Sequence, residues 1–123
     1  SDWSPSWGGA AGGMYSTLGD LGRWAGTGFG ATLLSPRLGA ARLAGPTTND
    51  GADEYGLGLT HWGEDWVGHT GQIIGWESFA GYNVKTGDVI VLMVNETGSL
   101  PDVLPTLLDV ANPDLRRTLA AGR

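Results

Sequence analysis

The sequence predicts an α+β fold. Over roughly the first 45 residues the apolar side chains recur at the spacing of an amphipathic helix, whereas from residue 55 to residue 95 they follow the period of two that is typical of β-strands. After the strands, Leu104, Leu107 and Leu108 return to helical spacing and predict a C-terminal helix. Helices followed by a run of strands, instead of alternating with them, are typical of an antiparallel sheet with helices packed on it.

The first predicted helix covers residues 17–27. Thr17 and Asp20 fit a capping box, in which the Thr17 hydroxyl accepts a hydrogen bond from the Asp20 amide while the carboxylate reaches back. Apolar residues then recur on one helix face. Three glycines lower the helix propensity of this segment, so we expect packing to stabilise it. The preceding residues, 1–13, show no regular period and are expected to be irregular.

A second helix is predicted to begin at Ser35 and Pro36, which suit the N-cap and the first helical position. It is expected to end at Gly45 and Pro46, because glycine and proline terminate helices. Residues 46–54 are polar and are predicted to form a loop before the first strand.

Four strands are predicted, over residues 55–62, 66–70, 75–83 and 88–95. A hairpin turn at residues 85–88 joins the last two. The fourth strand is apolar without alternation, so both of its faces are expected to be buried. Because one C-terminal helix covers only one face of a sheet, we expect chain outside this sequence to cover the other.

The last helix is expected to begin at Ser99, which with Asp102 fits a second capping box. It is predicted to end near Asn112 and Pro113, and a short tail helix is predicted over residues 114–120.

Composition bounds the function. A length of 123 residues suits one domain, and a charged fraction of 16% is low enough to predict that another protein segment covers part of the surface. The net charge of −6 argues against binding to nucleic acid, which needs clustered Lys and Arg. The absence of cysteine from the sequence excludes disulfides and thiolate metal sites. No apolar run in the sequence reaches the length of a transmembrane segment.

One short run carries a resemblance to a known family. Gly68-His69-Thr70-Gly71-Gln72 resembles the third active-site motif of the serine β-lactamase and penicillin-binding protein hydrolases, in the branch of class C β-lactamases, D-Ala-D-Ala carboxypeptidases and related esterases. That motif is Lys-Thr-Gly, with His-Thr-Gly as a variant. Other segments resemble the family in the same order along the chain, at residues 11–21, 33–36, 55–59, 67–75 and 89–95.

The other two motifs of the family are missing from this sequence. No serine is followed three residues later by lysine, and no tyrosine is followed two residues later by asparagine. The resemblance therefore implies the C-terminal part of a β-lactamase-like catalytic domain, with a helical part over about 1–50 and the sheet and terminal helix over about 51–123. The expected partner is a complementary N-terminal chain or segment that carries Ser-x-x-Lys, and this chain alone is expected to be inactive.

The resemblance also implies roles in acyl transfer through an acyl-serine, without a metal or organic cofactor. The backbone N–H of Gln72 would be an oxyanion-hole donor, and the Thr70 hydroxyl would bind the substrate, often at a carboxylate. Gly71 would let the substrate backbone approach the strand. His69 would hydrogen-bond or polarise the Tyr and Ser side chains of the missing part, with activity that depends on pH between about 5 and 8. We expect Trp76 to border the cleft.

Some other residues have simpler interpretations. A zinc site built from His61, Glu64, Asp65 and His69 is conceivable, but this spacing fits no standard zinc pattern. Ser16 is more simply part of a helix cap than a nucleophile, because no general base lies near it in sequence.

Glu77 and Asp88 are interpreted as solvated positions on a strand and a turn. The six tryptophans could line a ligand groove, but packing in the core is the simpler expectation for most of them, including Trp24, Trp62 and Trp66.

Two functions from different classes remain open. The first is part of a serine hydrolase that acts on a small-molecule, peptide or ester substrate. The second is a non-catalytic binding module with a degenerate β-lactamase-like fold and a Trp-rich binding surface. The hydrolase predicts an exposed strand edge and exposed apolar surface in the isolated chain, whereas the module predicts a chain that folds alone as a monomer. A secreted or cell-envelope location is favoured by analogy with the family.

Overall fold

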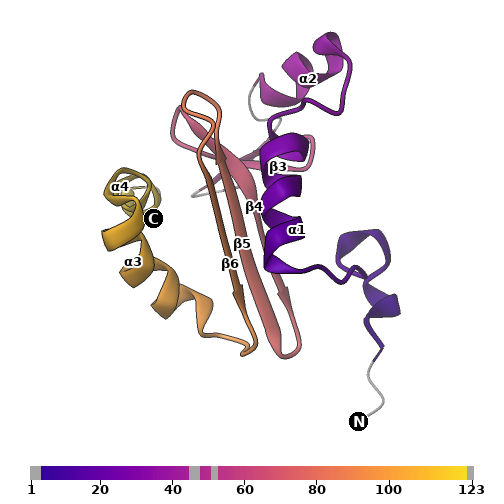
Figure 1. Cartoon of the computed structure of the whole chain (residues 1–123), viewed down its shortest axis with the longest axis vertical. Coiled ribbons are helices and arrows are strands. Elements are labelled where there is room, and N and C mark those ends of the chain that lie inside the picture. Colours follow the sequence, from indigo (N-terminus) through magenta and orange to yellow (C-terminus); the bar gives the residue numbers. More distant parts are fainter. Residues whose placement is uncertain (1–3, 45–47, 51–52, 122–123) are drawn as a thin grey trace.

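The computed structural model describes residues 4–44, 48–50 and 53–121. A six-stranded antiparallel sheet lies between two helical layers, with α1 (Leu18–Trp24) on one face and α3 (Leu100–Ala111) with α4 (Pro113–Ala121) on the other (Figure 1). The strands are adjacent in the order in which they occur along the chain, which makes the sheet a meander. The predicted α+β class is therefore confirmed.

The six strands are β1 Thr48–Asp50, β2 Asp53–Gly56, β3 Leu59–Trp62, β4 Trp66–Ile73, β5 Trp76–Asn83 and β6 Val89–Val94. The last three confirm three of the predicted strands. β4 runs three residues further than predicted, to Ile73, because it pairs with β5 along its whole length, from Trp66↔Asn83 to Ile73↔Trp76. The β4–β5 hairpin is the longest strand pairing in the sheet.

The predicted strand over 55–62 and the predicted loop over 46–54 are both wrong. β2 ends at Gly56, and a two-residue turn at Leu57 and Gly58 reverses the chain into β3. Both turn residues have positive φ, 48° and 75°, as a type I′ hairpin turn requires. Leucine is not a residue that such turns favour, so the sequence hides this turn. The part of the predicted loop at 48–50 is β1 and the part at 53–54 is the start of β2, while 45–47 and 51–52 lie outside the described residues.

On the N-terminal side, η1 (Pro5–Ala11) is a 3₁₀ helix where an irregular segment was predicted. α1 continues directly into η2 (Ala25–Phe29), a short π-helix. The predicted helix over 17–27 is therefore confirmed, although its C-terminal part is π-helical and runs on to Phe29. α2 (Pro36–Leu43) confirms the second predicted helix, although the Ser35 side chain makes no capping hydrogen bond.

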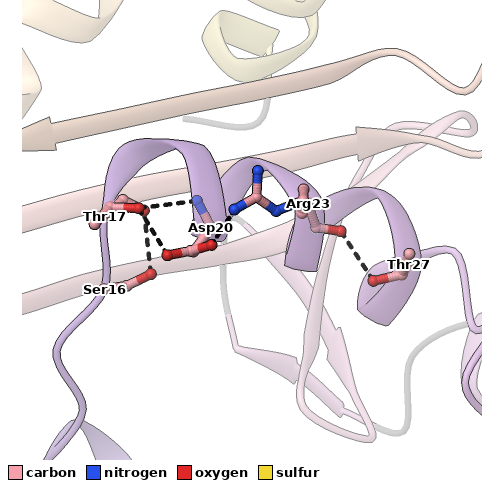
Figure 2. A network of polar contacts seen from close by, with 5 residues as sticks. All are labelled: Ser16, Thr17, Asp20, Arg23 and Thr27. Atoms are coloured by element: carbon pink, nitrogen blue, oxygen red, sulfur yellow. Dashed lines mark hydrogen bonds and ion pairs between the residues drawn. The ribbon is translucent and has the colours of Figure 1, made fainter.

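The cap of α1 forms largely as predicted (Figure 2). The Thr17 hydroxyl accepts from the Asp20 amide at 3.1 Å, and the Asp20 carboxylate accepts from the Thr17 hydroxyl at 2.9 Å. Arg23, one turn later, donates to the same carboxylate. The hydrogen bond from Thr17, followed by the hydrogen bond and positive charge of Arg23, lowers the pKa of Asp20. Ser16 only donates to the neighbouring Thr17 carbonyl, at 3.1 Å.

α1 and η2 cover one face of the sheet. The buried residues there are Ala25, Phe29, Leu59, Val67 and Ala80. This layer belongs to the chain itself, so the expectation that only external chain could cover the second face is wrong. The sequence did not show that a glycine-rich helix would supply it. Trp24 lies at the rim and is 50% exposed, so its predicted place in the core is also wrong.

α3 and α4 cover the other face. Their core contains Trp62, Trp66, Phe79, Leu100, Leu108 and Leu115. Trp62 stacks on Phe79 with ring centroids 4.9 Å apart, which confirms that two of the tryptophans pack in the core. The predicted C-terminal and tail helices are confirmed as α3 and α4.

β6 is the last strand of the sheet, and in the described part of the chain its outer edge pairs with no strand. Its residues from Ile90 to Val94 are half-buried and Val89 is exposed, so the predicted burial of both faces is wrong. The apolar side chains of β6 are thus only partly covered.

Candidate active site

The predicted motif, Gly68 to Gln72, occupies five consecutive positions of β4. His69, Thr70 and Gln72 are exposed and Gly71 is half-buried. β3 pairs with β4 only from Trp66 to Gly68, so within the described ranges β4 has a single strand partner, β5, from His69 onward. The short hairpin of β2 and β3 therefore leaves the motif on an open strand edge.

Alternation along β4 divides the motif between the two faces of the sheet. His69 pairs with Ala80, which belongs to the core beneath α1 and η2. Thr70 pairs with Phe79, which belongs to the core beneath α3 and α4. His69 and Gly71 therefore lie on the α1 side, and Thr70 and Gln72 lie on the α3 side.

A pocket of about 270 Å³ opens on the α3 side of this edge. It lies between β4 and the first turn of α3. Its lining residues are Thr70, Gly71, Gln72, Glu77, Leu100, Pro101 and Leu104. Three of the five predicted site residues therefore share one concave surface with an apolar wall from α3.

Glu77 is the charged residue of this pocket, and its interpretation as a solvated position is wrong. Only 5% of the residue is exposed. Its carboxylate accepts the Leu100 N–H at 2.7 Å and also accepts from the Gln72 side-chain amide. The Leu100 N–H, then that of Gly98, hold the pKa of Glu77 below its usual range against the opposing effect of burial.

Glu77 therefore supplies the N-terminal cap of α3, which the sequence assigned to Ser99. The Ser99 hydroxyl donates instead to the Glu96 carbonyl at 3.0 Å, and its side chain makes no capping hydrogen bond. A carboxylate at a helix N-terminus satisfies otherwise unpaired N–H groups and is favoured by the helix dipole. One signal in the sequence pointed to burial: Glu77 shares its strand face with Phe79.

The Gln72 side chain is fixed by its bond to Glu77, its cross-strand partner in the β4–β5 register. This contact ties the motif strand to the start of α3 through one buried carboxylate. The role assigned to the Gln72 backbone N–H remains a prediction.

His69 is held by two contacts. Its Nε2 lies 3.1 Å from the Tyr55 hydroxyl, and its Nδ1 bonds to the Thr70 carbonyl oxygen. The two rings meet edge to face, with centroids 5.7 Å apart and an interplanar angle of 79°. Tyr55 comes from β2, two strands away from β4, and sequence reasoning did not assign it to the site.

The register brings Tyr55 beside the motif, but strand alternation does not by itself account for its contact with His69. Tyr55 pairs with Thr60 and Thr60 pairs with Gly68, so Tyr55 is level with the residue before His69.

Gly68 is required at this position, because a Cβ there would lie 2.0 Å from the Ala80 carbonyl oxygen and 2.9 Å from the Trp62 ring.

Trp76 lies at the start of β5, opposite Ile73, and is 52% exposed. The hairpin turn beside it is fixed by Thr97, whose hydroxyl accepts the Gly75 N–H at 2.6 Å and donates to the Ile73 carbonyl at 3.2 Å. Trp76 therefore directly follows a turn that is fixed by Thr97, at the tip of the β4–β5 hairpin. Its contact with substrate stays a prediction.

Among the residues that the structure describes, no three His, Cys, Asp or Glu side chains are grouped to hold a metal ion. The conceivable zinc site of His61, Glu64, Asp65 and His69 therefore has no support in this geometry. Within the same ranges, no helix is both long and apolar enough to cross a membrane.

Comparison with known families decides the relationship. The sequence model of the Beta-lactamase family matches residues 1–112, from before η1 to the end of α3. The chain belongs to the beta-lactamase family. No match was found among curated proteins. Family membership agrees with the fold and with the resemblance of the β4 motif to the serine hydrolases of the β-lactamase and penicillin-binding type.

Proposed function

We propose that this chain forms one wall of the active site of a serine hydrolase, which cleaves amide, β-lactam or ester bonds through an acyl-serine intermediate. The observation that carries the proposal is the open edge of β4. It presents His69, Thr70, Gly71 and Gln72 in order, and the last three of these line a pocket. An extended substrate can add to such an edge through its own backbone groups.

The nucleophile comes from a complementary segment with the Ser-x-x-Lys motif. Its serine oxygen attacks the substrate carbonyl and forms the new C–O bond, and negative charge develops on the carbonyl oxygen. The Gln72 N–H stabilises that charge, and loss of such a donor costs roughly 3–4 kcal/mol of transition-state stabilisation. The intermediate then collapses: the substrate's bond to its amine or alcohol leaving group breaks, and that group takes up the proton lost by the serine. Water hydrolyses the acyl-serine, which releases the carboxylic acid and regenerates the hydroxyl.

Thr70 and Gly71 shape the substrate site. The Thr70 hydroxyl lines the pocket and binds a polar group of the substrate, such as a carboxylate. Gly71 has no side chain, so the substrate backbone can approach the strand edge closely. A Cβ at position 71 would lie 2.6 Å from the Ser78 hydroxyl, so glycine also suits the packing of β4 against β5.

The complementary segment is also the proposed partner for the uncovered apolar surface. A second pocket of about 270 Å³ lies between the half-buried β6 and α3, and is lined by apolar residues that include Ile90, Leu92, Leu104 and Leu107. Burial of apolar surface stabilises association at about 25 cal/mol per Å². Docking of a segment here would cover β6 and provide the second part of the catalytic centre.

The resemblance favours an esterase or peptidase-like member over a dedicated β-lactamase. It also favours a member of the class C β-lactamase and D-Ala-D-Ala carboxypeptidase branch, because the motif is His-Thr-Gly and the Tyr55-Gly56-Leu57-Gly58 run precedes it. A secreted or cell-envelope location follows by the same analogy.

The test is turnover of an activated ester, a chromogenic β-lactam and a D-Ala-D-Ala peptide by the chain combined with its complementary segment. His69→Ala should lower turnover of the accepted substrate by roughly 100-fold or more, the scale of an acid–base contribution. The matched control is His61→Gln on the neighbouring strand, where turnover should hold. Unchanged turnover in His69→Ala would contradict the assigned role.

A second candidate is the non-catalytic binding module. It is favoured by the two helical layers, which cover both faces of the sheet from within this chain. It predicts a soluble 12.8 kDa monomer with no hydrolysis of any of the three substrates. Native mass spectrometry separates it from the hydrolase, which predicts a stable complex with the complementary segment.

A further inference from the structure

We propose that Tyr55 is a positioning residue, whose hydroxyl holds the imidazole of His69 in one tautomer and one orientation at the open edge of β4. The proposal rests on the proposed function for the role of His69. Its structural part stands on the Tyr55–His69 contact alone.

The hydrogen-bond partners assign the protons. The Thr70 carbonyl oxygen can only accept, so the Nδ1 atom of His69 carries a hydrogen. In a neutral imidazole the Nε2 atom is then the acceptor, and the Tyr55 hydroxyl, 3.1 Å away, is the donor. The arrangement is a chain from the Tyr55 O–H through the imidazole to the Thr70 carbonyl. Each bond in such a chain polarises the next.

The exposure of His69 explains why its imidazole ring needs a contact that fixes its orientation. His69 is exposed, and in the described part of the chain it lies one residue beyond the last β3–β4 pair, Thr60↔Gly68. An exposed histidine ring can rotate about its two side-chain torsions and exchange its proton between nitrogens. Tyr55 limits both motions, through the bond at Nε2 and the edge-to-face contact of the rings.

The backbone makes this contact possible from a distant strand. β2 and β3 form a short hairpin that brings Tyr55 level with Gly68, next to His69. Tyr55 is itself at the surface, with 37% of the residue exposed, so replacement by phenylalanine keeps the ring without opening a core cavity. Tyr55→Phe therefore removes the hydroxyl and keeps the ring.

Imidazole ¹⁵N NMR tests the proposal directly, on the protein in the assembly in which it purifies. The His69 signals are identified by their loss in His69→Gln. In its neutral form the wild-type imidazole should show Nδ1 protonated and Nε2 unprotonated, and Tyr55→Phe should show a mixture of tautomers. The matched control is Tyr82→Phe on β5, which should leave the His69 signals in place. An unchanged His69 spectrum in Tyr55→Phe would overturn the proposal.

Kinetics of the complete enzyme give the functional arm. Tyr55→Phe should lower kcat by about 3- to 10-fold, the scale of one hydrogen bond, with KM unchanged. An unchanged or faster kcat would mean that Tyr55 only occupies Nε2 until another group replaces it, and would overturn a positioning role in the reaction. If the wild type itself hydrolyses nothing while the tautomer shifts as expected, the proposed function fails and the Tyr55–His69 assignment stands.

Discussion

The two halves of β4 differ sharply although they are one continuous strand. Trp66, Val67 and Gly68 are buried and lie between β3 and β5, whereas the residues from His69 to Ile73 pair with β5 alone in the described part of the chain and are largely exposed. The first half packs against both helical layers. The second half carries four of the five predicted site residues, His69, Thr70, Gly71 and Gln72.

The largest contrast is expected on the partner strand, between Phe79 and Trp76 of β5. Phe79 is 1% exposed beneath α3 and α4, so Phe79→Ala should destabilise the fold by about 3–5 kcal/mol. Trp76→Ala, at the exposed hairpin tip, should cost less than about 1 kcal/mol while lowering substrate affinity. Denaturant unfolding measures the stability of both variants, and a substrate-binding assay measures their affinities. Equal stability losses would contradict the division of the hairpin into a core end and a site end.

The two glycines of β4 sharpen the comparison. Gly68→Ala places a Cβ 2.0 Å from the Ala80 carbonyl oxygen, which cannot move without the strand, so we expect a loss of about 3 kcal/mol or failure to fold. Gly71→Ala meets only the Ser78 hydroxyl, at 2.6 Å, and should cost about 1 kcal/mol. Thermal unfolding compares them, and Gly71→Ala combined with Ser78→Gly should regain stability but not substrate turnover. A larger stability loss in Gly71→Ala than in Gly68→Ala would contradict the comparison.

The link between the open half of β4 and the start of α3 should depend on pH. The lowered pKa of Glu77 means that its charged form is favoured in the folded state. This stability is present above the usual glutamate pKa of 4.5 and is lost as the pH falls through the lower folded value. Glu77→Gln should therefore flatten the acid limb of a pH–stability profile, whereas Glu64→Gln in an exposed turn should not. The same acid loss in wild type and Glu77→Gln would show that the cap of α3 does not need the carboxylate.

The smallest effect is expected far from β4, at the cap of α1. Thr17→Ala removes the hydroxyl that accepts the Asp20 amide and should cost about 1 kcal/mol. Ser16→Ala removes a hydroxyl that bonds only the neighbouring carbonyl and should be near neutral. Urea unfolding compares the two variants. If Ser16→Ala cost as much as Thr17→Ala, the assignment of the cap would be wrong.

The parts of the fold that could be predicted from the sequence are those with local signals. The Thr17–Asp20 cap, the alternation along β5 and the helical spacing of α3 each depend on residues within one turn or one strand. The order of the motifs likewise placed the His-Thr-Gly run on a strand. Family membership, which the match over residues 1–112 shows, agrees with that placement.

The parts that could not be predicted depend on contacts between distant segments. The Leu57–Gly58 turn breaks the rule for its type, and the pattern around it reads as one strand. Glu77 is buried because it meets the start of α3, 23 residues further along the chain. Tyr55 reaches His69 only once β3 has folded between them.

The central claim is that β4 presents its open half to a nucleophile that lies outside these residues. Labelling of the purified assembly with a fluorophosphonate, followed by peptide mass spectrometry, tests this most directly. We predict one modified serine, within a Ser-x-x-Lys sequence that is not part of residues 1–123, and loss of labelling in His69→Ala. A label on a serine of this chain, such as Ser16, or no label in an assembly that hydrolyses its substrate, would contradict the account.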